Sequence, residues 1–361
     1  MNNKETYTFE DALAAARAGV TPAVAWLVPL LDCSEADAPL LFAAANEVRA
    51  ASVGDDIHLR GLIEFSNICR KDCAYCGIQR SNSSVERYRL SVETIIRTAQ
   101  EAEELGYRSV VLQSGEDMWF TPERLAEAIR GIKESTDLAI TLSVGERDYE
   151  TYKLWYEAGA DRYLLRIETT NPELFAALHP DDNLEARKRC LYDLKALGYQ
   201  LGSGVMTGLP GQTPEMLARD VIWLHELGAE MIGVGPFIPH PETPLAEATG
   251  GTVAATLRLV AVLRLVFPDA HLPATTAMGS LDPLGREAAL QAGANVMMPN
   301  VTPTDTRPKY EIYPGKICLS DDARHCRGCI TMRIKSIGRQ VGTDRGDVKR
   351  ERDAKNGGRC S

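Results

Sequence analysis

The sequence contains no apolar run of the length needed to cross a bilayer. The stretch "AVAWLVPLL" is too short and contains Pro29. The first residues include several acids and no continuous apolar core, so we expect no signal peptide. A cytoplasmic protein is therefore expected. Cysteines stay reduced in that compartment, so they serve as ligands or core residues and not as disulfides.

Basic charge is also in the minority. The chain has 40 Lys+Arg against 50 Asp+Glu, for a formal net charge of −10. This balance argues against a nucleic-acid-binding protein. The exception is the basic stretch "RIKSIGRQVGTDRGDVKRERDAKNGGRC", which we expect to be a solvated end or, less often, a docking surface.

Helices and buried strands alternate along the chain. An amphipathic stretch that ends in Gly is repeatedly followed by a short apolar run, as in "AEELGYRSVVLQSG". The Gly caps a helix in the left-handed conformation, and the apolar run is a strand buried on both faces. Such strands are expected at 58–65, 109–113, 139–143, 162–167, 200–206, 231–235, 270–275 and 295–298.

Eight parallel strands predict an α/β fold of the (βα)8 TIM-barrel type. An open doubly wound sheet is the alternative, although no Gly-rich dinucleotide fingerprint follows the first strand. We divide the chain into three parts: residues 1–55, a helical extension expected on the barrel's amino-terminal face; residues 56–315, the barrel; and residues 316–361, an extension with cysteines and the basic tail.

Six of the nine cysteines fall into two tight groups. The first, Cys69, Cys73 and Cys76 in "CRKDCAYCGIQR", starts four residues after the first strand, where a barrel carries its catalytic loops. A closed structural metal site takes four ligands, whereas three leave a position open for chemistry. Zinc is disfavoured here because no His lies near this loop.

The segment "CRKDCAYC" resembles the signature of the radical S-adenosylmethionine (SAM) superfamily. The resemblance implies a [4Fe–4S] cluster on Cys69, Cys73 and Cys76, with the fourth iron left for SAM. It also implies reductive cleavage of SAM to methionine and a 5′-deoxyadenosyl radical. "LQSGED" resembles the family's Gly-Gly-Glu motif, which holds the amino group of SAM, with Ser114 in place of the first Gly.

Polar residues near the other strand ends complete the candidate site. Arg166 and Glu168 alternate with Leu165 and Ile167, so both point to one side, as a buried salt bridge or, as we favour, a ligand site. The candidates for substrate contact or catalysis are Arg166, Thr141, Thr275, Thr276, Tyr310 and Tyr313. The candidates for cofactor binding are Tyr75, Gln113, Ser114, Gly115, Glu116, Ser143, Glu168, Arg187 and Met231.

Segments from about residue 60 to 330, among them "GLIEFSNICRKDCAYCGIQR", "GVGPFIPHPETPLA" and "YEIYPGKIC", resemble the HydE family of [FeFe]-hydrogenase maturases. The resemblance implies action on a cysteine-bound Fe(CO)2(CN) precursor during assembly of the diiron subsite. The implied partners are the maturases HydG and HydF and an electron donor such as ferredoxin or flavodoxin. One departure is Ile167, where the family pattern has His.

The second cysteine group is Cys318, Cys326 and Cys329. Many HydE proteins carry such a triplet, which implies an auxiliary iron–sulfur cluster. A Cys3His zinc site that includes His325 is the alternative.

Three other functions remain open. One is a radical SAM mutase or synthase on a small amino acid, similar to methylornithine synthase. The second is a non-enzymatic iron–sulfur carrier, which would not need the polar strand ends. The third, a zinc-dependent barrel hydrolase, is disfavoured because paired His ligands are absent from the strand ends.

Overall fold

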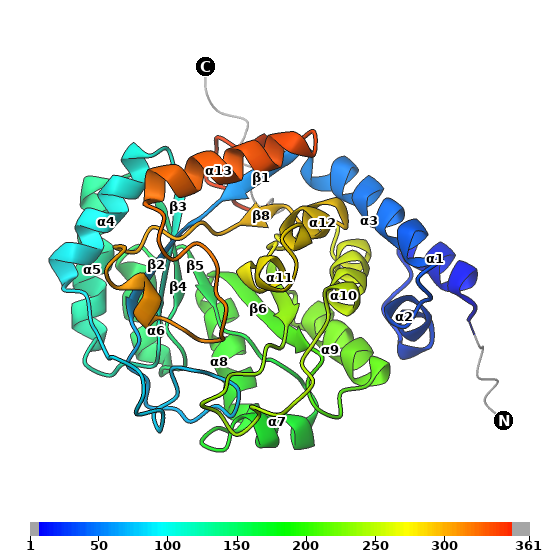
Figure 1. Cartoon of the computed structure of the whole chain (residues 1–361), viewed down its shortest axis with the longest axis horizontal. Helices are drawn as coiled ribbons and strands as arrows, with labels where there is room; N and C mark the ends of the chain where they lie inside the picture. Colours follow the sequence, from blue (N-terminus) through cyan, green and yellow to red (C-terminus); the bar gives the residue numbers. More distant parts are fainter. Residues whose placement is uncertain (1–6, 349–361) are drawn as a thin grey trace.

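The computed structural model describes residues 7–348 and contains one parallel barrel (Figure 1). Six strands pair in sequence order, all of them parallel. These strands are β2 (Gly61–Ser66), β3 (Ser109–Ser114), β4 (Ala139–Ser143), β5 (Arg162–Leu164), β6 (Gln200–Thr207) and β7 (Met231–Pro236). β1 (Asp56–Leu59) runs into β2 through Arg60 and pairs with β8 (Val296–Met297).

The barrel closes through the segment in which we predicted a seventh strand, residues 270–275. This segment forms no regular strand, but single parallel bridges join His271 to β7 and Pro273 to β8. The Ile232 amide donates to the His271 carbonyl at 2.9 Å, and the Ala274 amide donates to the Val296 carbonyl at 2.9 Å. A regular ladder cannot continue here because Pro273 has no amide hydrogen to donate. The prediction of a parallel barrel is confirmed. Between β7 and β8, the barrel wall is held by these single bridges and hydrogen bonds and not by a regular strand ladder.

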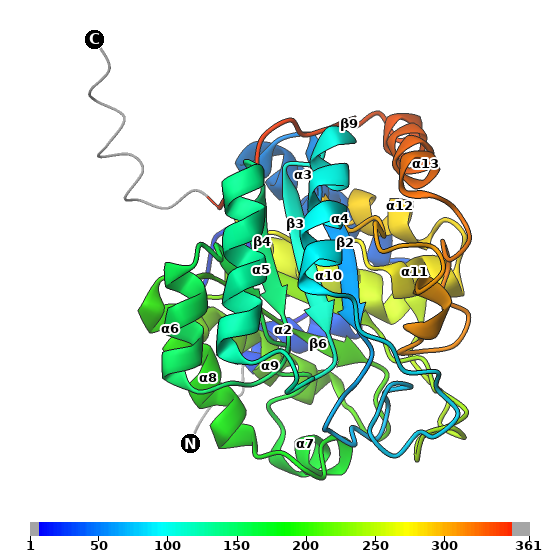
Figure 2. The ribbon, with the colours of Figure 1, turned by 90° about the vertical axis from the view of Figure 1, so that its left-hand side faces the viewer.

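Helices form the outer layer (Figures 1 and 2). They are α4 (Val92–Glu104), α5 (Pro122–Ser135), α6 (Tyr149–Glu157), α7 (Pro172–Leu178), α8 (Leu184–Leu197), α9 (Pro214–Leu227), α10 (Val253–Val266), α11 (Thr276–Leu281) and α12 (Gly285–Gln291). The glycines of the repeated helix-to-strand pattern all have positive φ, as expected: Gly106, Gly159, Gly198, Gly228 and Gly293.

The amino-terminal helices do not lie where we expected them. α1 (Phe9–Arg17), α2 (Val24–Leu31) and α3 (Ala38–Val53) pack mainly on the outer side of the barrel, with α2 against α9 and α10 and α3 along α10 (Figure 1). α2 is apolar around most of its surface, so it needs neighbours on several sides. The expectation that this extension covers the amino-terminal face is wrong for that reason. Within residues 7–348, no helix is long and apolar enough to span a membrane.

The carboxyl-terminal extension returns to the barrel. After the short 3-10 turn η1 (Arg307–Lys309), α13 (Ala323–Ser336) packs on the outside, and β9 (Gln340–Val341) pairs with the first two residues of β1. Figure 2 shows β9 at the end opposite to the loop after β2. The expectation of a solvated end is therefore wrong for residues 340–348. Residues 349–361, with Cys360, lie outside the described part.

The close approach of β6 and β7 gives a stability prediction. A Cβ added to Gly204 would lie 1.8 Å from the Gly233 carbonyl oxygen, so the backbone would have to move. We expect Gly204→Ala to lower the free energy of unfolding by about 1–3 kcal/mol or more. The paired Gly233→Ala is the control, because its nearest neighbours would be 3.9 Å away. Denaturant unfolding of both variants measures the difference, and equal losses would contradict the explanation.

Candidate active site

One cavity of about 370 Å³ runs inside the barrel. It brings together every barrel residue that the sequence put forward as a site candidate. These residues are Cys69, Cys73, Tyr75, Cys76, Gln113, Ser114, Gly115, Glu116, Thr141, Ser143, Arg166, Glu168, Arg187, Met231, Thr275, Thr276, Tyr310 and Tyr313. They come from many segments of the chain, because parallel strands all end at the same rim.

The three cysteines lie in an irregular loop after β2. The Cys69 sulfur accepts hydrogen bonds from the amides of Lys71 (3.4 Å) and Glu116 (3.3 Å). Burial raises the pKa of Cys76 to about 12 and raises that of Cys73 as well. Among the described residues, no three His, Cys, Asp or Glu side chains are placed to hold one metal ion.

The loop after β3 is packed directly against the cysteine loop. A Cβ on Gly115 would lie 2.4 Å from the Ile68 carbonyl oxygen and 2.8 Å from the Cys69 Cβ. Only glycine allows this approach, so the two loops meet at a fixed distance. The neighbouring Glu116 is held by Arg70 at 2.9 Å and accepts the Glu146 amide at 2.9 Å.

Arg166 and Glu168 form an ion pair just beyond the end of β5, in which Glu168 is buried and Arg166 is partly exposed. Arg166 Nη2 lies 2.8 Å from Glu168 Oε2. Burial raises the pKa of Glu168, and the positive charges of Arg166 and Arg187 oppose that rise. Ile167 between them is fully buried in the core and does not line the cavity.

Glu168 has a φ of 63°, which is unusual for a residue with a side chain. The turn that follows it is held by Asp220 on α9, whose Oδ1 accepts from the amide and the hydroxyl of Thr170, both at 2.6 Å. We did not single out Asp220 from the sequence. The sequence feature that could have identified Asp220 is an acidic residue among the apolar positions of "MLARDVIWL".

Arg187 already has protein partners. Its guanidinium is paired with Glu146 and with Asp182 (2.7 Å), and it donates to the Arg166 carbonyl at 2.9 Å. Lys71 also pairs with Asp182. The sequence singled out Arg187 alone and missed the acids and Lys71 that surround it.

Several buried polar atoms of the cavity wall have no partner in the described part of the chain. They include Thr141 Oγ1, Thr275 Oγ1 and Arg166 Nε. Thr275 stands at the N-cap of α11, yet its hydroxyl does not cap the helix. Buried polar groups are nearly always hydrogen-bonded in folded proteins, so these atoms fit a polar ligand in the cavity.

A second buried ion pair was missed. Lys316 pairs with Glu64 of β2, and Asn300 donates to the same carboxylate at 2.7 Å. The Lys316 ammonium also donates to the Tyr310 carbonyl at 3.1 Å. Tyr310 in turn accepts a hydrogen bond from Gln113 at 3.3 Å. This network ties the carboxyl-terminal extension to the cavity wall.

The second cysteine group does not line the cavity. Cys318 and Cys326 line a small neighbouring pocket against the barrel wall, beside Arg286. The hydrogen bond with Cys326, supported by the positive charge of Arg286, lowers the pKa of the Cys318 thiol below its usual value. His325 is exposed whereas Cys326, next to it on α13, is buried, so the two side chains point in different directions.

The chain resembles known proteins over most of its length. The radical SAM superfamily profile matches residues 63–224. The chain is 49% identical over 310 residues to the [FeFe] hydrogenase maturase subunit HydE of Thermotoga maritima, covering 86% of this chain and 89% of that one. It is 30% identical over 276 residues to 3-methylornithine synthase of Methanosarcina acetivorans, covering 76% and 77%.

Solved structures show the same fold. Methylornithine synthase (PylB) superposes with a TM-score of 0.79 and 26% identity, covering 95% of this chain and 99% of that one. HydG, a maturase of the [FeFe]-hydrogenase, superposes with a TM-score of 0.80 over 94% of this chain and 78% of that one. At 20% identity, the likeness to HydG concerns the fold alone.

The buried Asp220 predicts a pH-dependent contribution to stability. Burial raises the pKa of its carboxyl to about 6, whereas an unfolded Asp has a pKa of about 3.9. The folded state therefore binds this proton more tightly, and the stabilising contribution of Asp220 is lost as pH rises from about 4 to about 6.

The quantity to follow is the difference between the free energies of unfolding of the wild type and of Asp220→Asn. We expect this difference to fall by about 2–3 kcal/mol between about pH 4 and about pH 6, and to stay constant at higher pH. Asn keeps the oxygen that accepts the hydrogen bonds from Thr170. The two proteins have every other titratable group in common, so the contributions of those groups to the pH dependence cancel in the difference. Denaturant titrations of both proteins at a series of pH values measure it. A difference that does not change with pH would contradict the prediction.

Proposed function

Because the chain belongs to the radical SAM superfamily, and within it to the HydE family, we propose that it acts in assembly of the diiron subsite of [FeFe]-hydrogenase. The family implies a [4Fe–4S] cluster and SAM, so the chain is a radical SAM enzyme. The proposed substrate is a cysteine-bound Fe(CO)2(CN) complex. The observation that carries the proposal is a single cavity lined both by the three thiols and by buried polar atoms without partners.

In this proposal Cys69, Cys73 and Cys76 hold the cluster. When bound, the cluster and SAM supply reductive cleavage of SAM to methionine and a 5′-deoxyadenosyl radical. The residues proposed to hold SAM near the thiols are Tyr75, Gln113, Ser114, Gly115, Glu116, Ser143, Glu168 and Arg187. Met231, the ninth candidate from the sequence, is the first residue of β7 and contacts Arg60 at the opposite end of the cavity, so we do not assign it to SAM. Glu168 is suited to a cationic group, because its carboxylate is buried in the cavity wall and its ion-pair partner Arg166 is partly exposed. Arg187 is already paired with two acids, so in this proposal it supports the SAM site by holding this side of the cavity mouth in place.

The substrate would lie deeper, against Thr141, Arg166, Thr275, Thr276, Tyr310 and Tyr313. The unpartnered threonine hydroxyls can donate to anionic cyanide or carboxylate groups. Arg166 offers a planar guanidinium for a carboxylate. A closed barrel wall also keeps a reactive radical away from bulk solvent.

A reaction similar to that of methylornithine synthase is the second candidate. Methylornithine synthases share the fold of this chain, but their sequence identity to it is lower, at 30%. The 49% identity to HydE favours the maturase. Ile167 does not weigh against it, because this side chain points into the core and not into the cavity. An iron–sulfur carrier would have no use for unpartnered polar atoms deep in a barrel.

The partners that follow from this function are HydG as supplier of the iron complex, HydF as acceptor of the product, and a ferredoxin or flavodoxin as electron donor. We propose an auxiliary iron–sulfur cluster at Cys318, Cys326 and Cys329, outside the reaction cavity. Cys318 and Cys326 line a small pocket that shares Thr276 and Lys316 with the reaction cavity, but neither cysteine lines the cavity itself.

The first prediction concerns the three thiols. Cys76→Ala should lower SAM cleavage by about 100-fold or more, because it removes a cluster ligand. Cys190→Ala, at a half-buried cysteine of α8, is the matched control and should leave cleavage unchanged. 5′-Deoxyadenosine is quantified after anaerobic reconstitution with iron and sulfide and reduction. Equal activity of both variants would exclude the proposed cluster site.

The second prediction identifies the substrate. The reduced wild-type protein should consume the HydG-derived iron complex in the presence of SAM, with a new adenosylated iron species seen by EPR. Lysine, offered in the same assay, should remain unchanged. Conversion of lysine with the iron complex untouched would instead establish the methylornithine synthase-like reading.

The third prediction concerns the second cysteine group. Cys326→Ala should lower the iron content from about eight to about four per chain, since each four-iron cluster needs its thiolates. SAM cleavage should remain, because Cys326 does not line the cavity. An unchanged iron content would rule out an auxiliary four-iron cluster at this position.

A further inference from the structure

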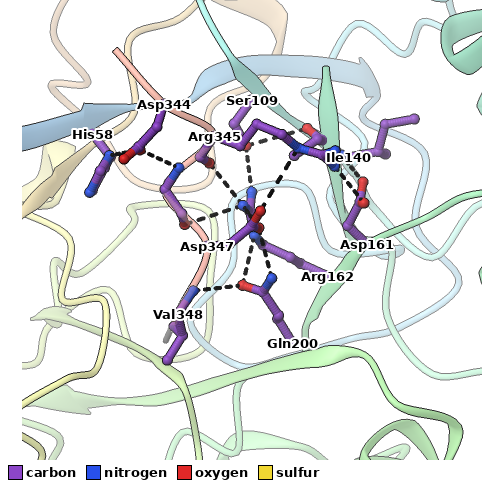
Figure 3. A network of polar contacts seen from close by, with 12 residues as sticks. His58, Ser109, Ile140, Asp161, Arg162, Gln200, Asp344, Arg345, Asp347 and Val348 are labelled. Carbon is purple, nitrogen blue, oxygen red and sulfur yellow. Dashed lines mark hydrogen bonds and ion pairs between the residues drawn. The ribbon is translucent and has the colours of Figure 1, made fainter. Parts of the chain in front are cut away.

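The chain passes back under the barrel at residues 344–348, which we call the C-terminal strap (Figure 3). Its main anchor is Arg162, the first residue of β5, which is fully buried. The Arg162 guanidinium donates to the carbonyls of Arg345 (2.8 Å) and Gly346 (3.2 Å) and pairs with Asp347. The guanidinium also donates to Gln200 Oε1 at 3.1 Å and to Ser109 Oγ at 2.6 Å. The strap and the barrel therefore share one buried cation, which makes the strap part of the fold.

Other strand starts hold the strap as well. Gln200, at the start of β6, donates to Asp347 at 2.7 Å and accepts the Val348 amide at 3.3 Å. Nδ1 of His58, on β1, lies 3.2 Å from Asp344 Oδ1. The strap is therefore fastened to β1, β5 and β6, across the end of the barrel where the strands begin (Figure 3).

One contact connects the strap to the reaction cavity. Arg60, between β1 and β2, is buried and lines the cavity. Its guanidinium donates to Met231 Sδ at 2.8 Å and to the Gly346 carbonyl at 3.3 Å. The strap therefore lies directly behind the cavity wall, at the end opposite to the three thiols.

We propose that the C-terminal strap is a positioning segment for the reaction. It closes the floor of the cavity and fixes Arg60 from behind, and so it sets the depth at which the iron-containing substrate rests. SAM, held near the thiols at the other end, is outside its influence. The identity of the substrate in this inference rests on the proposed function. The closure of the cavity floor by the strap does not depend on it.

Gly346 is the position at which the strap can be displaced selectively. Its φ is 63°, and an added Cβ would lie 2.8 Å from His58 Cγ and 2.9 Å from His58 Nδ1. Gly338, before β9, has a similar φ of 74°, but an added Cβ there would meet nothing within 4 Å. Alanine at either position introduces the same kind of backbone strain. Only Gly346→Ala also pushes the strap away from His58.

The experiment compares the full-length wild type, Gly346→Ala and Gly338→Ala after anaerobic reconstitution. For Gly346→Ala we expect KM for the iron complex to rise by about tenfold or more, because a misplaced floor changes where the substrate binds. The Kd for SAM and substrate-free SAM cleavage should stay within about twofold of the wild type. Gly338→Ala should keep all three quantities and should lose only the thermal stability that the backbone strain costs.

Asp347→Asn provides a milder variant that keeps the strap backbone. It removes the ion pair with Arg162 and should raise the same KM by a smaller factor. Equal changes in the Kd for SAM and in KM, or no change in KM for Gly346→Ala, would overturn the proposal.

Hydrogen exchange separates this test from the proposed function, because it needs no substrate. In Gly346→Ala the amides of residues 56–66 should exchange faster, while those of residues 69–80 should not change. If the wild type fails to consume the iron complex, the proposed function fails, and the exchange data still decide whether the strap closes the floor. Unchanged exchange at residues 56–66 would refute the closure itself.

Discussion

The contact between Gly115 and the cysteine loop determines the geometry of the whole site. With a would-be Cβ 2.4 Å from the Ile68 carbonyl, no side chain fits there, and the Glu116 amide reaches the Cys69 sulfur at 3.3 Å. The loop after β2, which carries the thiols, is thereby locked to the loop after β3. β2 and β3 are paired in parallel beneath the two loops, with one shift of register between Glu64 and Ser66, so the loops are anchored on neighbouring strands of one sheet.

Charge is arranged differently at the two ends of the barrel. At the mouth, Arg187 and Lys71 are matched by Asp182 and Glu146, so this rim is held by ion pairs close to the proposed cofactor. At the other end, Arg162 and Arg60 are buried and depend largely on carbonyls of the returning chain. The same barrel thus places chemistry at the carboxyl ends of its strands and support at their starts.

The local pattern predicted much of this structure. Apolar runs after Gly-capped helices identified the parallel strands, and the spacing of Cys69, Cys73 and Cys76 identified the site loop. The failures involve contacts between distant segments. Residues 270–275 make only bridges, because Pro273 lacks an amide hydrogen. Asp220 and Lys316 look like ordinary charges in the sequence, and only their burial against Thr170 and Glu64 reveals a role.

The sequence by itself determined the fold class and many of the residues that line the cavity, because strand period and strand-end position are local properties of the chain. It did not determine which charges neutralise one another, where α1, α2 and α3 pack, or that residues 344–348 lie beneath the barrel. Those features arise when the barrel closes and brings residues some 180 positions apart, such as Arg162 and Asp347, within bonding distance. Burial then decides which polar groups must find partners, and burial is a property of the tertiary structure alone.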